Sequence, residues 1–345
     1  MDPVLQIKDL NTSFYTSNGE LKAVRGVSFD VMPGEVLGIV GESGSGKSVT
    51  AMSILHLLAD TAKIKSGEII FRGKNIAMIS KKEIRSIRGK DIAMVFQDPM
   101  SSLNPLMTVG KQVGEMIRTH FPKKSNAQVK AEVLELFHQT RIPEPEKRYN
   151  SYPHEFSGGM RQRVMISIAL ACHPDILIAD EPTTALDVTI QAQILKMLSQ
   201  LRKDLGMSII FITHDLGVVA EICDRVCVMY GGMVMETSPV DNLFERPMHP
   251  YTHGLMLSMP SIDQDKESPL IPIPGSPPDM LNPPAGCPFC LRCQYARNIC
   301  ATEMPPFYLV EQNHYSRCWL LSTNAPDEDN PFNRTERERI QEVQQ

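Results

Sequence analysis

The segment GESGSGKS, residues 41–48, has the residue types and spacing of a loop that binds phosphate. It fits the pattern G-x-x-x-x-G-K-[ST], directly after the apolar run EVLGIV and directly before the helical pattern VTAMSILHLL. Glycines let backbone amides turn toward phosphate oxygens, and the start of the following helix adds a positive potential. We expect Lys47 to reach the β- and γ-phosphates of a nucleotide and Ser48 to bind Mg²⁺. The predicted nucleotide-binding residues of this loop are Gly41, Ser43, Gly44, Ser45, Gly46, Lys47, Ser48 and Val49.

Two adjacent acids form a second chemical group within DILIADEPTTALD, residues 175–187. An apolar run ends in Asp180, and Glu181 follows it. Taken alone, this pair also fits a solvated turn. Hydrolysis of a phosphoanhydride depends on positioning and on charge neutralisation, so it needs one carboxylate for Mg²⁺ and a second to polarise water. Beside a phosphate-binding loop, the sequence therefore predicts that Asp180 binds Mg²⁺ and that Glu181 acts on water.

Five cysteines near the C-terminus are candidate metal ligands: Cys287, Cys290, Cys293, Cys300 and Cys318. The start of the chain, MDPVLQIKDL, lacks the basic and apolar regions of a secretory signal, so we expect the reducing cytosol. In that compartment, clustered cysteines are more often metal ligands than disulfides. The remaining cysteines, Cys172, Cys223 and Cys227, lie in apolar surroundings and are predicted to be buried small hydrophobic residues.

The spacing of the cluster leaves its metal open. C-x₂-C-x₂-C resembles the start of a bacterial ferredoxin run, but the next gap is six residues where that run has three. C-x₂-C pairs also suit zinc. By spacing alone, the ligands are Cys287, Cys290 and Cys293, with Cys300 or Cys318 as the fourth.

The elements that must position these residues indicate an α/β fold. Buried strands are predicted at residues 35–40, 91–96, 175–180 and 208–213, because these short apolar runs have the right length and flanks. Residues 191–205 have the apolar spacing of a helix that packs on one side. This alternation is typical of a largely parallel sheet with crossover helices.

The chain divides into three predicted parts. Residues 1–247 form the nucleotide-binding domain, and a helical subdomain at about 100–170 has its clearest pattern at 124–140. After Met248, a proline-rich segment (268–284) and the cysteines indicate a small loop-rich module, residues 248–322. Residues 323–345 form a charged tail that we expect to end as an exposed or frayed helix.

Composition limits the partners. The formal net charge of −5 and the pI near 6.0 give no global reason to expect nucleic acid. The apolar run at 164–172 is far too short to span a bilayer. Membrane association must therefore go through a partner or a surface.

Further motifs resemble those of the ABC ATPases. FSGGMRQR (156–163) resembles their signature motif, FQDPMSSLNP (96–105) their Q-loop, TTALD (183–187) their D-loop, and ITHDL (212–216) their switch-histidine loop. The motifs stand in the family's order and cover about residues 5 to 240. The resemblance implies that two such units sandwich two ATP molecules head to tail. Each nucleotide would lie between the P-loop of one subunit and the signature motif of the other.

The same resemblance implies a role for individual residues. Gln97 would sense Mg²⁺ and the attacking water while contacting the transmembrane partner, Glu181 would act as the general base, and His214 would bond the γ-phosphate. Asp187 would help communication across the dimer. The residues that would grip the opposite subunit's γ-phosphate are Ser157, Gly158 and Gly159.

Two positions are less settled. The adenine would stack on Phe14, with the adjacent Tyr15 as the second choice. Met160 stands where many family members carry glutamine, although the subfamily below commonly has methionine there. This change leaves open how well the composite site hydrolyses ATP.

The C-terminal motifs HPYT (249–252) and IPG (273–275), with the cysteines, resemble the ATPase subunits of oligopeptide and dipeptide importers up to about Trp319. That subfamily implies a second, different ATPase subunit, two membrane permeases, an extracytoplasmic binding protein and a place on the cytoplasmic face of the membrane. Nickel and other small-solute importers use related subunits and are the alternative. The resemblance also implies that Cys287, Cys293, Cys300 and Cys318 bind a 4Fe-4S cluster, which makes Cys290 surplus. Zinc, free thiols or a disulfide are the competing states.

Two other function classes fit less well. Soluble ABC ATPases of DNA repair or translation tend to carry two cassettes or long coiled coils, and this sequence has one cassette and no sustained heptad run. A redox- or metal-sensing protein in which ATP is secondary would have no reason to keep Gln97, Glu181 and His214 together.

Overall fold

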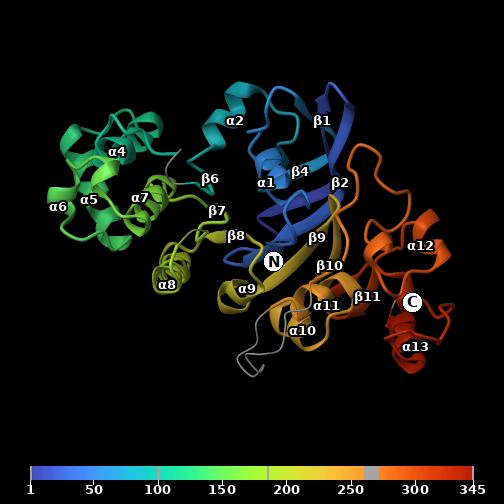
Figure 1. Cartoon of the computed structure of the whole chain (residues 1–345). Helices are drawn as coiled ribbons and strands as arrows, with labels where there is room; N and C mark the ends of the chain where they lie inside the picture. Colours follow the sequence, from blue (N-terminus) through green and yellow to red (C-terminus); the bar gives the residue numbers. More distant parts are fainter. Residues whose placement is uncertain (1, 99–101, 185, 260–271, 344–345) are drawn as a thin grey trace.

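The computed structural model describes residues 2–98, 102–184, 186–259 and 272–343 (Figure 1). Some predicted features fall outside these ranges. They are Pro99, Met100 and Ser101 of the predicted Q-loop, Ala185 of the predicted D-loop, and residues 268–271 of the proline-rich segment.

A parallel sheet forms the centre of the molecule and confirms the predicted strands. Its strands are β6 (Ile92–Val95), β7 (Ile176–Asp180), β8 (Ser208–Thr213), β3 (Val36–Val40) and β9 (Arg225–Tyr230). Neighbouring strands in this order are all parallel. The strands are nearly continuous apolar runs because helices cover both faces of the sheet.

Each face of the parallel sheet has its own helices. Helix α1 (Lys47–Ile54), which follows the P-loop, packs on one face with Ile39, Ile178 and Ile210. Helices α7 (Gly158–Leu170), α8 (Val188–Leu205) and α9 (Leu216–Ile222) pack on the other face. Helix α8 confirms the helix predicted at 191–205.

A second, antiparallel sheet was not predicted. Its strands β2 (Gly19–Val31), β1 (Leu5–Thr16), β4 (Ala62–Phe71) and β5 (Lys74–Asn75) lie in this order and cover the other side of α1. The sequence carries a signal for it, because Val27, Phe29 and Val31 recur at every second residue and are all buried. Helix α2 (Lys81–Ile87) follows, with a capping box formed by Ser80 and Glu83.

The predicted helical part lies beside β6, at one edge of the central sheet (Figure 1). It consists of α4 (Val109–His120), α5 (Asn126–Gln139), α6 (Pro145–Arg148), the 3₁₀ turn η1 (Pro153–Glu155) and α7. Helix α5 confirms the pattern at 124–140, and a capping box of Ser125 and Gln128 starts it.

The C-terminal region lies at the opposite edge of the central sheet (Figure 1). Its elements are β10 (Met233–Pro239), α10 (Val240–Glu245), α11 (Pro250–Leu257), η2 (Cys290–Arg292), α12 (Asn298–Thr302), β11 (Tyr308–Glu311), β12 (His314–Ser316), η3 (Trp319–Leu321) and α13 (Arg334–Val343). Strand β12 pairs with β10, so the predicted C-terminal module continues the central sheet. The domain boundaries at residues 248 and 323 stay predictions.

A buried pair of polar side chains reinforces this junction. The His314 ring Nε2 lies 2.8 Å from Glu236 Oε1, and both side chains are fully buried. The Met248 backbone N–H donates to the same oxygen, and Ser316 Oγ donates to the Met248 carbonyl. Strands β10 and β12 and the segment before α11 are thereby fixed to one another.

The charged tail differs from the prediction. It forms a helix, α13, but this helix is not exposed along its length, because Ile340 and Arg337 are buried. Ile340 packs in a cluster with Val310 of β11, and Arg337 donates to the carbonyls of Ser322 and Ala325. The sequence prediction failed here because one apolar residue and one well-bonded arginine are enough to anchor a highly charged helix.

Helices in the described ranges do not combine the length and the apolar character needed to cross a membrane.

Candidate active site

The predicted phosphate-binding loop joins β3 to α1, as its motif requires. Gly41, Gly44 and Gly46 have positive φ angles of 150°, 78° and 98°. A Cβ on Gly46 would lie 2.6 Å from the Ala23 carbonyl oxygen, so this position needs glycine for space as well as for conformation. The loop therefore turns its backbone toward the position where phosphate would lie.

Lys47 is already held over this loop. Its side chain is 6% exposed, and Nζ donates to the carbonyls of Gly41 and Glu42 at 2.7 and 2.9 Å. Burial lowers the pKa of Lys47, and the carboxylates of Glu181, Asp180 and Glu42 oppose this shift. Of the other predicted loop residues, Ser45 is buried, Ser48 and Val49 are half-buried, and Ser43 is exposed.

Asp180 lies next to the loop at the carboxyl end of β7. Ser48 Oγ donates to Asp180 Oδ1 at 3.0 Å, so the two predicted Mg²⁺ ligands are adjacent. Burial raises the pKa of Asp180, while the hydrogen bond from Ser48 opposes the shift. These hard oxygen donors, close together beside a phosphate loop, suit Mg²⁺.

Glu181 brings the predicted catalytic residues together. Gln97 Nε2 donates to its Oε2 at 2.9 Å, and the His214 ring Nδ1 lies 3.2 Å from its Oε1. Thr184 Oγ1 also donates to Oε2, at 2.9 Å. Glu181 has the left-handed φ angle of 45°, uncommon for a residue other than glycine, and its N–H donates to the Ile212 carbonyl.

This grouping follows from the topology. Gln97, Glu181 and His214 come shortly after β6, β7 and β8, and the carboxyl ends of these parallel strands share one edge. Sequence reasoning assigned no role to Thr184, although the residue stands inside the predicted D-loop.

The signature residues lie at the start of α7, in the helical part of the molecule. Ser157 caps this helix by accepting the N–H of Met160, and Gly158 is exposed. A Cβ on Gly159 would lie 2.6 Å from Ile190 Cγ2, so this glycine lets α7 approach α8. Within the described part of the chain, no hydrogen bond or ion pair joins these residues to the P-loop. The structure therefore does not bring signature and P-loop into one site within this chain.

The aromatic candidates Phe14 and Tyr15 point to opposite sides of β1. Thr12 Oγ1 lies 3.0 Å from Ser53 Oγ of α1, and strand alternation puts Phe14 on the same face as Thr12. Tyr15 is 41% exposed, and its hydroxyl accepts from Lys65 at 2.7 Å. Only Phe14 thus shares the face that is directed toward the P-loop helix.

The five clustered cysteines line one narrow cavity together with His249, Tyr295 and Trp319. Burial raises the pKa of the Cys287 thiol to about 12 and that of Cys293 to about 11, and it raises the pKa of Cys318 well above its usual range. Cys290 is only half-buried.

The side-chain positions do not support the expected 4Fe-4S cluster. Among the described residues, no three of the His, Cys, Asp and Glu side chains are arranged to hold a metal ion. Of the three scattered cysteines, Cys172 and Cys227 are buried as predicted, and burial raises the pKa of each to about 11, whereas Cys223 is half-buried.

The sequence also missed a contact from α11. The hydroxyl of Tyr251 accepts the backbone N–H of Glu42, the second residue of the P-loop motif, at 2.8 Å. Tyr251 belongs to HPYT, which was noticed only as a family motif. A contact between residues so far apart has no local signal that could reveal it.

Comparison with family models gives two matches. Residues 24–184 match the model described as ABC transporter. Residues 235–300 match the model described as the oligopeptide/dipeptide transporter C-terminal region, which starts within β10 and ends at Cys300. The second match therefore includes most of the cysteine cluster but not Cys318.

Known proteins align along almost the whole chain. The oligopeptide transport ATP-binding protein OppD of Bacillus subtilis is 54% identical over 329 residues, which are 95% of this chain and 92% of that protein. The dipeptide transport ATP-binding protein DppD of Lactococcus lactis is 50% identical over 325 residues, 94% of this chain and 93% of that protein.

Solved structures share the fold. The ATP-binding cassette MJ0796, a dimer bound to ADP and Pi in a post-hydrolysis state, superposes with a TM-score of 0.62 and 28% identity over 68% of this chain and 98% of that one. CbiO1 of Clostridium perfringens, part of an ABC transporter complex, gives a TM-score of 0.61 and 31% identity over 71% of this chain and 92% of that one. The chain belongs to the ABC transporter ATPases, in the family of oligopeptide and dipeptide transport ATP-binding proteins.

Proposed function

We propose that this chain hydrolyses ATP to power the import of oligopeptides or dipeptides through a pair of membrane permeases. The observation that carries the proposal is the grouping around Glu181. Its carboxylate contacts Gln97, Thr184 and His214, directly after the Asp180 that accepts from Ser48. The relatives named for oligopeptide and dipeptide transport supply the substrate class.

In the proposed mechanism, the P-loop amides and Lys47 bind the phosphates. Ser48, Asp180 and Gln97 would hold Mg²⁺, which neutralises charge on the phosphate oxygens when it is bound. Glu181 accepts the proton of the attacking water, and His214 bonds the γ-phosphate. The adenine stacks on Phe14, with Tyr15 as the second candidate, because Phe14 lies on the face of β1 directed toward α1.

We also propose that the working enzyme is half of a heterodimer. Ser157 and Gly158 are exposed at the start of α7, a position suited to a phosphate bound by another subunit. Asp187 caps α8 by accepting the Ile190 N–H and would transmit contacts across the dimer. The relative MJ0796 has been solved as a dimer, which supports this arrangement.

The remaining assignments extend this proposal. The second ATPase subunit, two permeases and an extracytoplasmic binding protein would complete the transporter, with this chain peripheral on the cytoplasmic face of the membrane. Residues 1–247 would be the ATPase domain, 248–322 the peptide-importer module and 323–345 the tail. A related nickel or small-solute importer is the alternative.

For the cysteine cavity we propose a 4Fe-4S cluster on Cys287, Cys293, Cys300 and Cys318. The support is that all four line one cavity and that Cys287, Cys300 and Cys318 are buried, while Cys293, like Cys290, is half-buried. Soft thiolates favour such a cluster, and zinc is the competing occupant. The thiol positions would have to adjust and the thiols deprotonate when it binds. Its role would be to stabilise the loops that carry the cysteines.

Co-purification tests the function. The full chain, tagged and purified from detergent-solubilised membranes, should carry a second ATPase subunit and two permeases. Its ATPase activity should rise with peptide-loaded binding protein. A stable complex with nucleic acid, or stimulation by a nickel-loaded binding protein and not by a peptide-loaded one, would contradict the proposal.

A further inference from the structure

Arg292, from the cysteine loop, reaches the P-loop. The arginine stands between Cys290 and Cys293 in the sequence, and its side chain is only 6% exposed. Its Nη1 donates to Glu42 Oε2 at 2.7 Å and to the Tyr230 hydroxyl at 3.1 Å. Glu42 is the second residue of GESGSGKS, so one charge-assisted hydrogen bond joins the two motifs.

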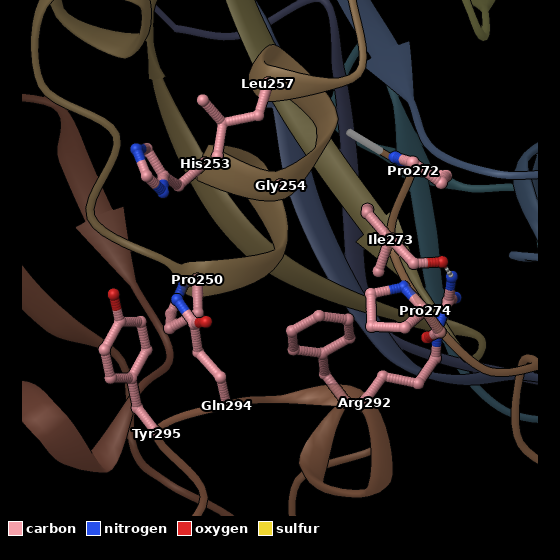
Figure 2. Close-up of a pocket in the computed structure, with 11 residues that line it drawn as sticks. Pro250, His253, Gly254, Leu257, Pro272, Ile273, Pro274, Arg292, Gln294 and Tyr295 are labelled. Atoms are coloured by element: carbon pink, nitrogen blue, oxygen red, sulfur yellow. Dashed lines mark hydrogen bonds between the residues drawn. The ribbon is translucent and has the colours of Figure 1, made fainter. Parts of the chain in front are cut away.

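The rest of the guanidinium is bonded to the proline-rich segment. Nε donates to the Pro274 carbonyl at 2.8 Å and Nη2 to the Ile273 carbonyl at 3.0 Å. Figure 2 shows Arg292 extending toward these two residues at one side of a cavity of about 120 Å³, which α11 borders on the other side. The planar group also lies over the rings of Tyr230 and Phe289. Arg292 thus has a single, well-determined position.

Glu42 is held at each of its polar groups. Its carbonyl accepts from Lys47, its N–H donates to Tyr251, and its carboxylate accepts from Arg292. Two of these three partners come from the C-terminal region. Burial alone would lower the pKa of Arg292, but its hydrogen bonds with Glu42 and Tyr230 raise it, so the guanidinium stays charged.

We propose that Arg292 is a positioning residue for ATP binding, which holds the P-loop in its phosphate-binding conformation through Glu42. Glu42 directly precedes the turn at residues 43–46, and its carbonyl and that of Gly41 both accept from Lys47. A loop held in place before the nucleotide arrives loses less conformational entropy on binding. Arg292 does not contact Glu181, Gln97 or His214, so the chemical step should depend on it little.

The test compares single and double variants of the full chain in its transporter complex. Arg292→Ala should raise the KM for ATP about tenfold and leave kcat within about a factor of two. The variant loses a charge-assisted hydrogen bond that positions the P-loop for ATP binding, while the groups that act in hydrolysis are unchanged. Glu42→Gln, the milder change, should raise KM about threefold. The double variant should have the same KM for ATP as Arg292→Ala alone, because both changes remove the same interaction between Arg292 and Glu42.

Arg297→Ala is the matched control. Arg297 belongs to the same cysteine loop, but its side chain donates to the Glu328 carbonyl. It should leave the KM for ATP unchanged. If Arg292→Ala does not fold, Glu42→Gln and Arg292→Lys decide the question, with Lys keeping the charge and giving an intermediate KM. Additive effects in the double variant, an equal shift in Arg297→Ala, or a lower kcat at unchanged KM would each overturn the proposal.

Discussion

The nucleotide site and the cysteine cavity are built on different principles. In the first, each key polar side chain has a partner within the protein: Lys47 has the loop carbonyls, Asp180 has Ser48, and Glu181 has Gln97, Thr184 and His214. In the second, the cysteines line a cavity among apolar and aromatic neighbours such as Phe289 and Trp319. The nucleotide site is preorganised, whereas in the cavity burial raises the pKa of the thiols.

The comparison teaches which contacts each region depends on. A preorganised site should lose function and keep its fold when one catalytic group is changed. A change to a buried cysteine of the cavity should instead lower stability together with metal binding. The single tryptophan of the chain, Trp319, lines the cysteine cavity and can report on that region alone.

The largest effect is expected at Glu181. Glu181→Gln keeps the size of the side chain but removes the base, so ATP hydrolysis should fall about 10²- to 10⁴-fold. ATP binding should persist, and a closed dimer should accumulate in size-exclusion chromatography with ATP.

Lys47→Ala should instead weaken nucleotide binding, measured by titration with a fluorescent ATP analogue. Hydrolysis unchanged in both variants would show that the assigned site is wrong.

A smaller effect, on both metal binding and thermal stability, is expected from a change at Cys318. Cys318→Ser should abolish metal binding and lower the thermal unfolding temperature by roughly 5 °C or more. Cys290→Ser is the matched variant, and it should leave both unchanged. Iron, sulfide and zinc analysis of anaerobically purified protein, with a visible spectrum, provides the measurement.

The two variants also distinguish the ligand set derived from cysteine spacing, which includes Cys290, from the set implied by the family resemblance, which does not. Loss of metal in Cys290→Ser would favour the set derived from spacing. Colourless protein with stoichiometric zinc would rule out the iron–sulfur cluster.

The smallest effect is expected in acid-induced unfolding, where the region around the cysteine cavity should lose its structure at a higher pH than the rest of the chain. Burial lowers the pKa of His249 from its ordinary 6.5 to about 3, against the hydrogen bond with the Arg317 backbone. Between these values the unfolded chain binds more protons than the folded one, so stability falls as pH drops, by at most about 1.4 kcal/mol per pH unit. At Asp180 the pH effect on stability has the opposite sign. Burial raises the pKa of this carboxyl, so the folded state binds more protons than the unfolded chain and mild acid favours it.

Trp319 emission should therefore change at a higher pH than the far-ultraviolet dichroism of the whole chain during acid titration. His249→Asn retains an acceptor for the Tyr251 N–H at the start of α11 and should reduce this early change. A coincident transition in both signals, unaltered by the variant, would argue against a separate acid-sensitive region.

Prediction from sequence succeeded where the information is local. The P-loop, the strands at 35–40, 91–96, 175–180 and 208–213, and helix α8 each depend on residues close in the chain. The roles of Gln97, Glu181 and His214 came from the family resemblance and stay predictions, while the structure groups their side chains because parallel strands align their carboxyl ends. Long-range contacts could not be predicted from the sequence, because they depend on how distant segments pack. Examples are the hydrogen bonds of Tyr251 and Arg292 with Glu42 and the burial of Ile340.

The pairing of β12 with β10 has a consequence for how this protein could be divided. Without the C-terminal residues, β10 would become an open edge strand, able to pair with other chains. The buried Glu236 would also lose the His314 ring that faces it. The ATPase domain therefore depends on the C-terminal residues to cover its edge strand, and an ATPase shortened to residues 1–247 should tend to aggregate.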